Sequence, residues 1–161
     1  VFMLVSAIHY SKYIALVIFV VASLTDTLDG YIARKYKLVS NFGKFMDPLA
    51  DKLLVSSAMI CLVSLNRIPA WVVIVIISRE FIISGFRLVA SDAGVVIAAS
   101  WWGKIKTVVQ MIMVIVLILS IHNPVVAVIE QILIYLALVL TVVSLLDYLI
   151  KNWKVMDDGK M

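Results

Sequence analysis

The sequence predicts an all-α integral membrane protein, a polytopic bundle of about five full transmembrane helices in a single domain covering residues 1–161. Three observations predict this fold. Hydrophobic residues make up 64% of the chain, charged residues only 15%, and the mean hydropathy is +1.12, which lies outside the range of soluble domains. The apolar residues form runs long enough to cross a bilayer, which takes about 20 residues as a helix. Short polar segments with Asn and Pro separate several of these runs.

Taken in order, the apolar runs predict five spans. These are residues 12–34, 48–65, 69–88, 105–121 and 125–150. Tight turns are expected at residues 66–69 and 122–124, where Asn and Pro interrupt the apolar pattern. The apolar run at residues 1–8 is too short to span a bilayer, so an N-terminal segment holding most of a first helix is expected to be missing. Cys61, the only cysteine, is predicted to be a core residue, and it excludes an intrachain disulfide.

The basic residues predict the orientation in the membrane, because cytoplasmic loops carry the excess of Lys and Arg. If residue 12 lies at the outer face, only Lys12 and Arg67 remain outside. The basic residues then on or near the cytoplasmic side are Arg34, Lys35, Lys37, Lys44, Arg87, Lys104, Lys106, Lys151, Lys154 and Lys160. The sequence therefore predicts a multi-pass protein of the cell membrane in which the acidic site described next faces the cytoplasm.

Four aspartates near the predicted cytoplasmic ends of the first two spans are the main indication of function. On a helix, Asp26 and Asp29 are separated by about 60° around the axis, and Asp47 and Asp51 by about 40°, so each pair shares a face. Pro48 is favoured at the first helical position, so Asp47 is expected to cap the second helix. Carboxylates in hydrocarbon are costly unless they are paired, hydrated or bound to metal, so these four predict a functional site.

Divalent cations are the expected partners of this acidic site. Four converging carboxylates repel one another, and two hard cations with a preference for oxygen ligands would neutralise them. The lack of a nearby His or Cys favours two Mg²⁺ or Mn²⁺ ions over zinc. The alternative is that Lys44 or Lys52 pairs with the aspartates and stabilises a helical hairpin.

Three residues that follow the first aspartates predict the ligand of these metals. The small side chains of Gly30 and Ala33 leave room for a ligand or a neighbouring helix to approach the backbone. Arg34 can bind phosphate, and two divalent ions with an arginine describe a diphosphate site. The alternative is that Gly30 and Ala33 only pack helices while Arg34 extends to the interface.

A second group of basic residues predicts binding of a phosphorylated second substrate. Arg79 falls inside the third span, and Arg87 returns to within about 80° of it on the same helix. With Lys104 and Lys106, these residues could form charge-assisted hydrogen bonds to a phosphate, and glycerol 3-phosphate fits. In the alternative, Arg79 pairs with Glu80 or an aspartate, and the others follow the positive-inside bias.

The full aspartate pattern is similar to the signature of a known family. The arrangement D-x-x-D-G-x-x-A-R-x8-G-x-x-x-D-x-x-x-D, from Asp26 to Asp51, resembles that of the CDP-alcohol phosphotransferases, with every fixed position present. The residues from Arg79-Glu80 to Arg87, together with 94–107, look like those of the bacterial phosphatidylglycerophosphate synthases within that family.

The resemblance implies a six-helix membrane enzyme, usually a homodimer, that binds two divalent ions and a CDP-linked lipid. It implies that Asp26, Asp29 and Asp47 are metal ligands and that Asp51 is both a ligand and the catalytic base. The cytidine diphosphate site would contain Asp29, Gly30, Ala33, Arg34, Gly43 and Asp47. The implied reaction transfers the phosphatidyl group from CDP-diacylglycerol to glycerol 3-phosphate, and no nucleic-acid partner is expected.

Three other functions are open at this point. A relative in the same family could use another acceptor, such as inositol phosphate or serine. The aspartates could instead coordinate an ion in transit through a divalent-cation transporter, although all four lie toward one side of the membrane, whereas a transporter needs a polar path to both. A membrane assembly protein without catalytic activity is the third, but it would not need four intramembrane aspartates.

Overall fold

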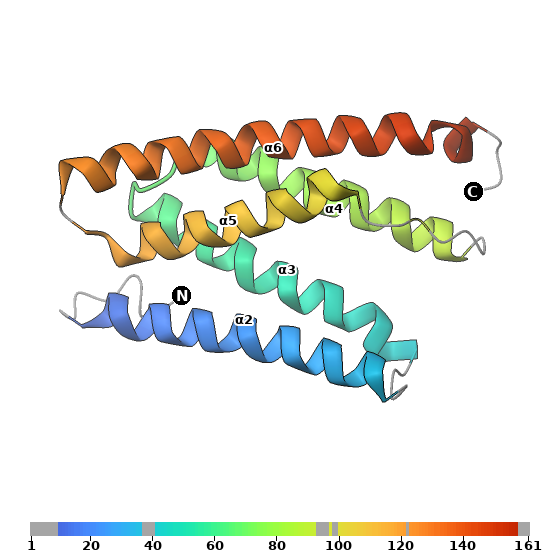
Figure 1. Ribbon diagram of the computed structural model, residues 1–161, viewed down its shortest axis with the longest axis horizontal. Helices are drawn as coiled ribbons and strands as arrows, with labels where there is room; N and C mark the ends of the chain where they lie inside the picture. The colour runs from blue at the N-terminus through green and yellow to red at the C-terminus, as the bar shows by residue number, and fades with distance from the viewer. Residues whose placement is uncertain (1–9, 37–40, 93–96, 98–99, 122, 158–161) are drawn as a thin grey trace. The chain divides into compact units, whose positions relative to one another are not determined.

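The computed structural model confirms the all-α prediction (Figure 1). It describes residues 10–36, 41–92, 97, 100–121 and 123–157. Within these ranges the chain forms five helices and no strand. The helices are α2 (Ser11–Lys35), α3 (Asn41–Ser64), α4 (Ala70–Asp92), α5 (Trp101–Leu119) and α6 (Pro124–Asp157). Each corresponds to one predicted span, and the segment at residues 1–8 lies outside the described residues.

One predicted boundary is wrong. The second helix was expected to begin at Pro48 with Asp47 as its cap, but α3 begins at Asn41, so Asp47 lies inside the helix. Asn41 is itself a residue type favoured at a helix start. Proline already has helical φ, and inside a helix it removes one backbone hydrogen bond. The extra turns place Asp47 and Asp51 on one continuous helix, so their i, i+4 relation holds.

The chain divides into two compact units. The first comprises Val1–Pro69 and Val114–His122, and the second comprises Ala70–Met113 and Asn123–Met161. In the first unit, α2 packs against α3 as an antiparallel hairpin (Figure 1). In the second, α4 packs against α6 and runs in the same direction, whereas α5 runs the opposite way (Figure 1).

Both predicted turns lie where helices end, and local chemistry explains each. After α3, Asn66 adopts a left-handed conformation with φ of 55°. Its N–H donates to the Val63 carbonyl at 2.9 Å, and the Arg67 N–H donates to the Leu62 carbonyl at 2.9 Å, the paired bonds of a Schellman cap. Before α6, the Asn123 side-chain oxygen accepts the Val125 N–H at 2.9 Å, which caps a helix that begins with proline.

Apolar side chains lie on the outside of two helices. On α2 the exposed residues recur every three or four positions: Ile14, Val17, Ile18, Val21, Leu24, Leu28 and Ile32. On α6 the corresponding residues are Val125, Val128, Ile129, Ile132, Tyr135, Leu136, Val139, Val142, Leu146 and Ile150. The buried residues meanwhile include charged and polar ones, namely Arg79, Lys106, Gln110, Thr141 and Ser144. The rest of the interior is mainly apolar, with Met59, Val72 and Met113 among its fully buried residues. Apolar outer faces together with buried charged residues suit a lipid environment.

In the part of the chain that the structure describes, two helical segments are long and apolar enough to cross a membrane, Trp101–Leu119 and Pro124–Asn152. Shorter apolar segments occupy Ser11–Thr25 and Lys52–Ser64 of α2 and α3. The remaining residues of α2 and α3 include the four aspartates of the motif, and the middle of α4 carries Arg79, Glu80 and Arg87. The presence of transmembrane-type helices is therefore supported, whereas a total of five full spans stays a prediction.

A charge placed on the exposed face of α6 should impair membrane insertion. Val139 is 56% exposed near the middle of the apolar segment, and arginine at the centre of a spanning helix costs about 2.5–3.5 kcal/mol on insertion scales. We expect Val139→Arg to lower the fraction of protein that stays in the membrane after alkaline extraction. Ile150→Arg, next to Lys151 near the end of the helix, serves as the control. Equal retention of both variants would contradict a lipid-facing α6.

Candidate functional site

The four motif aspartates lie at matching depths on the two helices of the first unit. Asp29 is six residues before the end of α2 at Lys35, and Asp47 is six residues after the start of α3 at Asn41. Asp26 is nine residues before that end, and Asp51 is ten residues after that start. Because α2 and α3 form an antiparallel hairpin, the inner pair lies about 9 Å and the outer pair about 14 Å from the connected ends.

The other motif residues occupy the same two helices. Gly30, Ala33 and Arg34 lie in the last two turns of α2, and Gly43 lies in the first turn of α3. Their side chains, like those of the aspartates, are outside the described part of the structure. The backbone thus brings the whole motif to one end of one hairpin, which is the arrangement that the pattern predicted.

The donor set of the motif suits an oxygen-binding metal. All four candidate ligands are carboxylates, which favour Mg²⁺ or Mn²⁺ and not the nitrogen and sulfur ligands of zinc sites. Among the side chains that the structure does describe, no group of three or more His, Cys, Asp or Glu residues could hold a metal. The aspartate motif on α2 and α3 therefore stays the candidate for a metal site.

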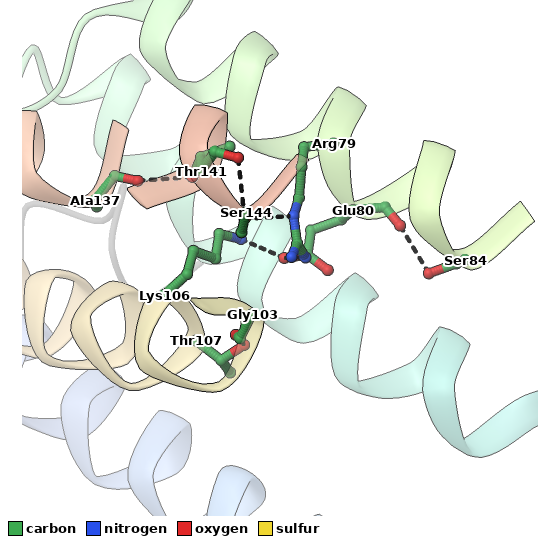
Figure 2. Close-up of polar contacts among 9 residues, drawn as sticks. All are labelled: Arg79, Glu80, Ser84, Gly103, Lys106, Thr107, Ala137, Thr141 and Ser144. Atoms are coloured by element: carbon green, nitrogen blue, oxygen red, sulfur yellow. Dashed lines mark hydrogen bonds and ion pairs between the residues drawn. The ribbon is translucent and has the colours of Figure 1, made fainter. Parts of the chain in front are cut away.

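In the second unit, one carboxylate interacts with two buried cations. Arg79 is 7% exposed on α4, and Lys106 on α5 is fully buried. Figure 2 shows both side chains directed at Glu80: Lys106 Nζ forms an ion pair with Glu80 Oε1, and Arg79 Nη1 lies 3.4 Å from the same oxygen. The expected alternative, a pairing of Arg79 with Glu80, is thus observed. Sequence reasoning did not foresee that Lys106 joins the same oxygen.

Small and polar residues surround Arg79 and complete its contacts. Arg79 Nε donates a hydrogen bond of 3.1 Å to the Ser144 hydroxyl of α6, and this hydroxyl donates to the Thr141 carbonyl at 3.0 Å (Figure 2). Gly103 of α5 also lies against Arg79. A Cβ atom added at position 103 would lie only 3.2 Å from Arg79 Nη2. Any side chain at position 103 would press on the guanidinium.

The other two predicted basic residues have different surroundings. Arg87, two turns beyond Arg79 on α4, has its guanidinium carbon 5.9 Å from the centre of the Tyr148 ring on α6. Lys104 is exposed on α5, with Nζ 5.1 Å from the centre of the Trp101 ring. The structure therefore brings Arg79 and Lys106 together, sets Arg87 against an aromatic ring and leaves Lys104 at the surface.

A hydrogen bond to a carboxylate of α6 holds the beginning of α5. The Ser100 hydroxyl donates to Asp147 Oδ2 on α6, and Asp147 Oδ1 also pairs with Lys151 at 2.7 Å. The Ser100 carbonyl accepts the Lys104 N–H at 3.2 Å, so Ser100 caps the helix. A carboxylate at a helix N-terminus is also favoured by the helix dipole. This contact holds the turn from which Gly103 and Lys106 extend.

The sequence contained a signal for the α6 residues at this site. Thr141, Ser144 and Tyr148 are spaced by three and four positions, so they share one face of a helix that is otherwise apolar. Such polar residues in a spanning helix point inward as a rule. Their partners could not be predicted, because Arg79 and Arg87 lie on a helix more than 50 residues earlier in the chain.

The arrangement leaves an excess of positive charge. Arg79, Lys106 and Arg87 carry three positive charges, and Glu80 is the carboxylate that the structure places against two of them. The net charge of these four side chains is therefore +2. A doubly charged phosphate monoester is an anion that would balance it.

Comparison with known proteins agrees with the motif. A family model described as CDP-alcohol phosphatidyltransferase matches residues 1–143. Over 142 residues, covering 86% of this chain and 72% of the relative, the chain is 51% identical to a Bacillus subtilis protein named CDP-diacylglycerol–glycerol-3-phosphate 3-phosphatidyltransferase. It is 41% identical over 147 residues, 88% of this chain and 78% of the relative, to a Haemophilus influenzae protein of that name. A probable phosphatidylglycerophosphate synthase of Mycobacterium tuberculosis is 39% identical over 142 residues, 87% of this chain and 67% of the relative.

Removal of the shared carboxylate should destabilise the second unit. Breaking a buried ion pair by removing one partner costs about 3–5 kcal/mol, because an uncompensated charge stays behind. We therefore expect Glu80→Gln to lower the apparent melting temperature of the protein in detergent. The added change Lys106→Met should restore part of the loss, because it removes the charge left unpaired.

The exposed Lys104 offers a matched control two residues away on the same helix. Lys104→Met should change the melting temperature little, whereas Lys106→Met alone should lower it. If Glu80→Gln melted at the wild-type temperature, the ion pairs would not stabilise the fold.

Proposed function

The chain belongs to the CDP-alcohol phosphatidyltransferase family, and we propose that it transfers the phosphatidyl group from CDP-diacylglycerol to glycerol 3-phosphate. The products are phosphatidylglycerophosphate and CMP, so the reaction is a step of phospholipid biosynthesis. The observation that carries this proposal is identity of 39–51% over most of the chain to relatives whose names state this transfer or this product.

The aspartate motif is the proposed donor site. Asp26, Asp29, Asp47 and Asp51 would hold two divalent cations, Mg²⁺ or Mn²⁺, and Asp29, Gly30, Ala33, Arg34, Gly43 and Asp47 would contact the cytidine diphosphate. When bound, such cations neutralise phosphate oxygens and stabilise the charge that develops on the leaving phosphate. The support is the all-oxygen donor set at one end of the α2–α3 hairpin.

The basic group of the second unit is the proposed acceptor site. Arg79, Arg87, Lys104 and Lys106 would bind the phosphate of glycerol 3-phosphate. The net charge of this group supports this role. Arg79, Lys106 and Arg87 with Glu80 carry a net charge of +2, and a phosphate monoester carries about two negative charges near neutral pH. An unphosphorylated alcohol such as serine would leave these charges unbalanced, which argues for a phosphorylated acceptor.

In the proposed reaction, a hydroxyl oxygen of glycerol 3-phosphate attacks the phosphorus that bears diacylglycerol. A new P–O bond forms to glycerol 3-phosphate while the bond from this phosphorus to CMP breaks, and CMP leaves with the bonding electrons. The hydroxyl proton passes to Asp51, the proposed base. Arg34 would bind the diphosphate and hold it in position for in-line attack.

The proposed location follows from the helices and the charges. The two apolar segments and the exposed apolar stripes support a multi-pass protein of the cell membrane. The clustering of basic residues beside the motif supports an active site facing the cytoplasm. A homodimer, which the family resemblance implies, belongs to the same proposal.

CMP release in detergent micelles tests the reaction directly. With CDP-diacylglycerol as donor, release should require both glycerol 3-phosphate and Mg²⁺ or Mn²⁺, and chelator should abolish it. Inositol phosphate and serine should fail as acceptors. Release with either of them and none with glycerol 3-phosphate would preserve the family chemistry and overturn the proposed acceptor.

Loss of one motif carboxylate should stop turnover without unfolding the protein. Asp47→Asn keeps the size of the side chain and removes its charge. Loss of a group that only orients a metal ligand already costs about 10–100-fold, so we expect loss of a ligand itself to lower CMP release by at least about 100-fold. The melting temperature in detergent should stay near that of the wild type. Asp157→Asn, outside the motif at the end of α6, is the control. Near-normal turnover of Asp47→Asn would contradict the metal site.

A further inference from the structure

Two buried polar groups of the second unit, the Tyr148 hydroxyl and the Arg87 guanidinium, face each other with only a weak contact between them. Tyr148 on α6 is 3% exposed, and its ring lies 5.9 Å from the guanidinium carbon of Arg87 on α4. The Arg87 guanidinium acts on the Tyr148 hydroxyl through its charge and as a hydrogen-bond donor. The contact falls short of good hydrogen-bond geometry, and both the hydroxyl oxygen and Arg87 Nε are buried without a well-formed hydrogen bond among the described residues.

This pairing is unusual for groups that serve only to hold the fold together. A buried donor without an acceptor costs about 1–3 kcal/mol, and phenylalanine at position 148 would keep the ring contact without that cost. Arg87 Nε can only donate, and a tyrosine hydroxyl donates readily. One oxygen atom with negative charge would accept from both groups.

We infer that Tyr148 is a specificity-determining residue of the acceptor site, and that its hydroxyl and Arg87 Nε donate hydrogen bonds to the phosphate of the phosphorylated acceptor. The charges support an anion, because Arg79, two turns from Arg87 on α4, is a second buried cation and no salt bridge joins Arg87 to a described carboxylate. Neutral alcohols lack the charge that this pair of donors would bind. The inference rests on the proposed function and adds a residue from α6 to it.

The packing of α6 also places the Tyr148 hydroxyl where it could bind a ligand. The side chain is enclosed on the inner face of α6 that carries Thr141 and Ser144. The neighbouring Ser144 binds Arg79, so this one face of α6 presents hydroxyl groups to both arginines of α4. Ser144 is already paired through Arg79 and Thr141, whereas the Tyr148 hydroxyl, which can only accept from Arg87, keeps its own proton available to donate to a ligand.

Tyr148→Phe is the sharpest test, because it removes one oxygen atom and keeps the ring. We expect the KM for glycerol 3-phosphate to rise about tenfold, the change produced by losing one charge-assisted hydrogen bond. The KM for CDP-diacylglycerol and kcat at saturating acceptor should stay within about twofold, since they do not depend on this bond. Tyr135→Phe, 56% exposed on the same helix, should match the wild type in every parameter.

Binding without turnover gives an independent measurement. Glycerol 3-phosphate or inorganic phosphate should raise the melting temperature of wild-type protein in detergent, and this rise should be smaller for Tyr148→Phe. In the absence of phosphate, Tyr148→Phe should melt at or above the wild-type temperature, because a buried unpaired hydroxyl is gone. A purely structural tyrosine would give lower stability and an unchanged KM.

Arg87→Lys supplies a second variant that keeps the positive charge and removes Nε. It should also raise the KM for glycerol 3-phosphate, and the double variant with Tyr148→Phe should lose less than the product of the two single effects, because both groups bind one phosphate. An unchanged KM in Tyr148→Phe, or equal increases for both substrates, would overturn the inference. Wild-type protein that releases no CMP with glycerol 3-phosphate would instead overturn the proposed function.

Discussion

The carboxylate of Glu80 is the constraint on which the second unit depends. It is the group that makes a buried Lys106 and a buried Arg79 compatible with an apolar bundle, and it links α4 to α5. Two cations at one carboxylate oxygen are not fully neutralised, so the fold retains positive charge in its interior. Such charge is expensive in hydrocarbon. A bound anion, as in the proposed function, would offset this cost. The hydrogen bond to Ser144 and the close approach of Gly103 restrict the position of Arg79.

The need to hold charged residues inside an apolar bundle separates α4, α5 and α6 into two kinds of helix. The later part of the chain contains the strongly apolar α5 and α6, whose outer faces meet the requirements of lipid, while α4 carries three charged residues in its interior turns. A helix as polar as α4 gains little from lipid alone, and packing against α6 supplies the partners that its arginines need. Packing against α6 and the Lys106 ion pair from α5 thus support α4, the helix that carries both arginines of the proposed acceptor site.

Hydropathy was enough to predict five helices and their order, because each span needs a run of apolar residues whatever surrounds it. Helical periodicity alone was enough to predict that Asp26 and Asp29 share one face of a helix, and that Asp47 and Asp51 share one face of the next. The start of α3 was missed because a local rule for Pro48 was given more weight than the good starting residue Asn41. The contacts of Lys106 and Tyr148 could not be predicted, because their partners lie on other helices and only the packing brings them together.

The early start of α3 has a consequence for the acidic motif. If the helix began at Pro48, Asp47 would lie outside it and its side chain would be directed by the loop. Because α3 runs unbroken from Asn41, the two inner aspartates lie the same number of residues from the connected ends of the hairpin, and the two outer ones differ by a single residue. An antiparallel pair of regular helices can match four carboxylates in depth in this way. The spacing of the motif therefore fits the hairpin. Of the eight residues between Arg34 and Gly43, Lys35 ends α2, residues 36–40 connect the two helices, and the last two belong to α3.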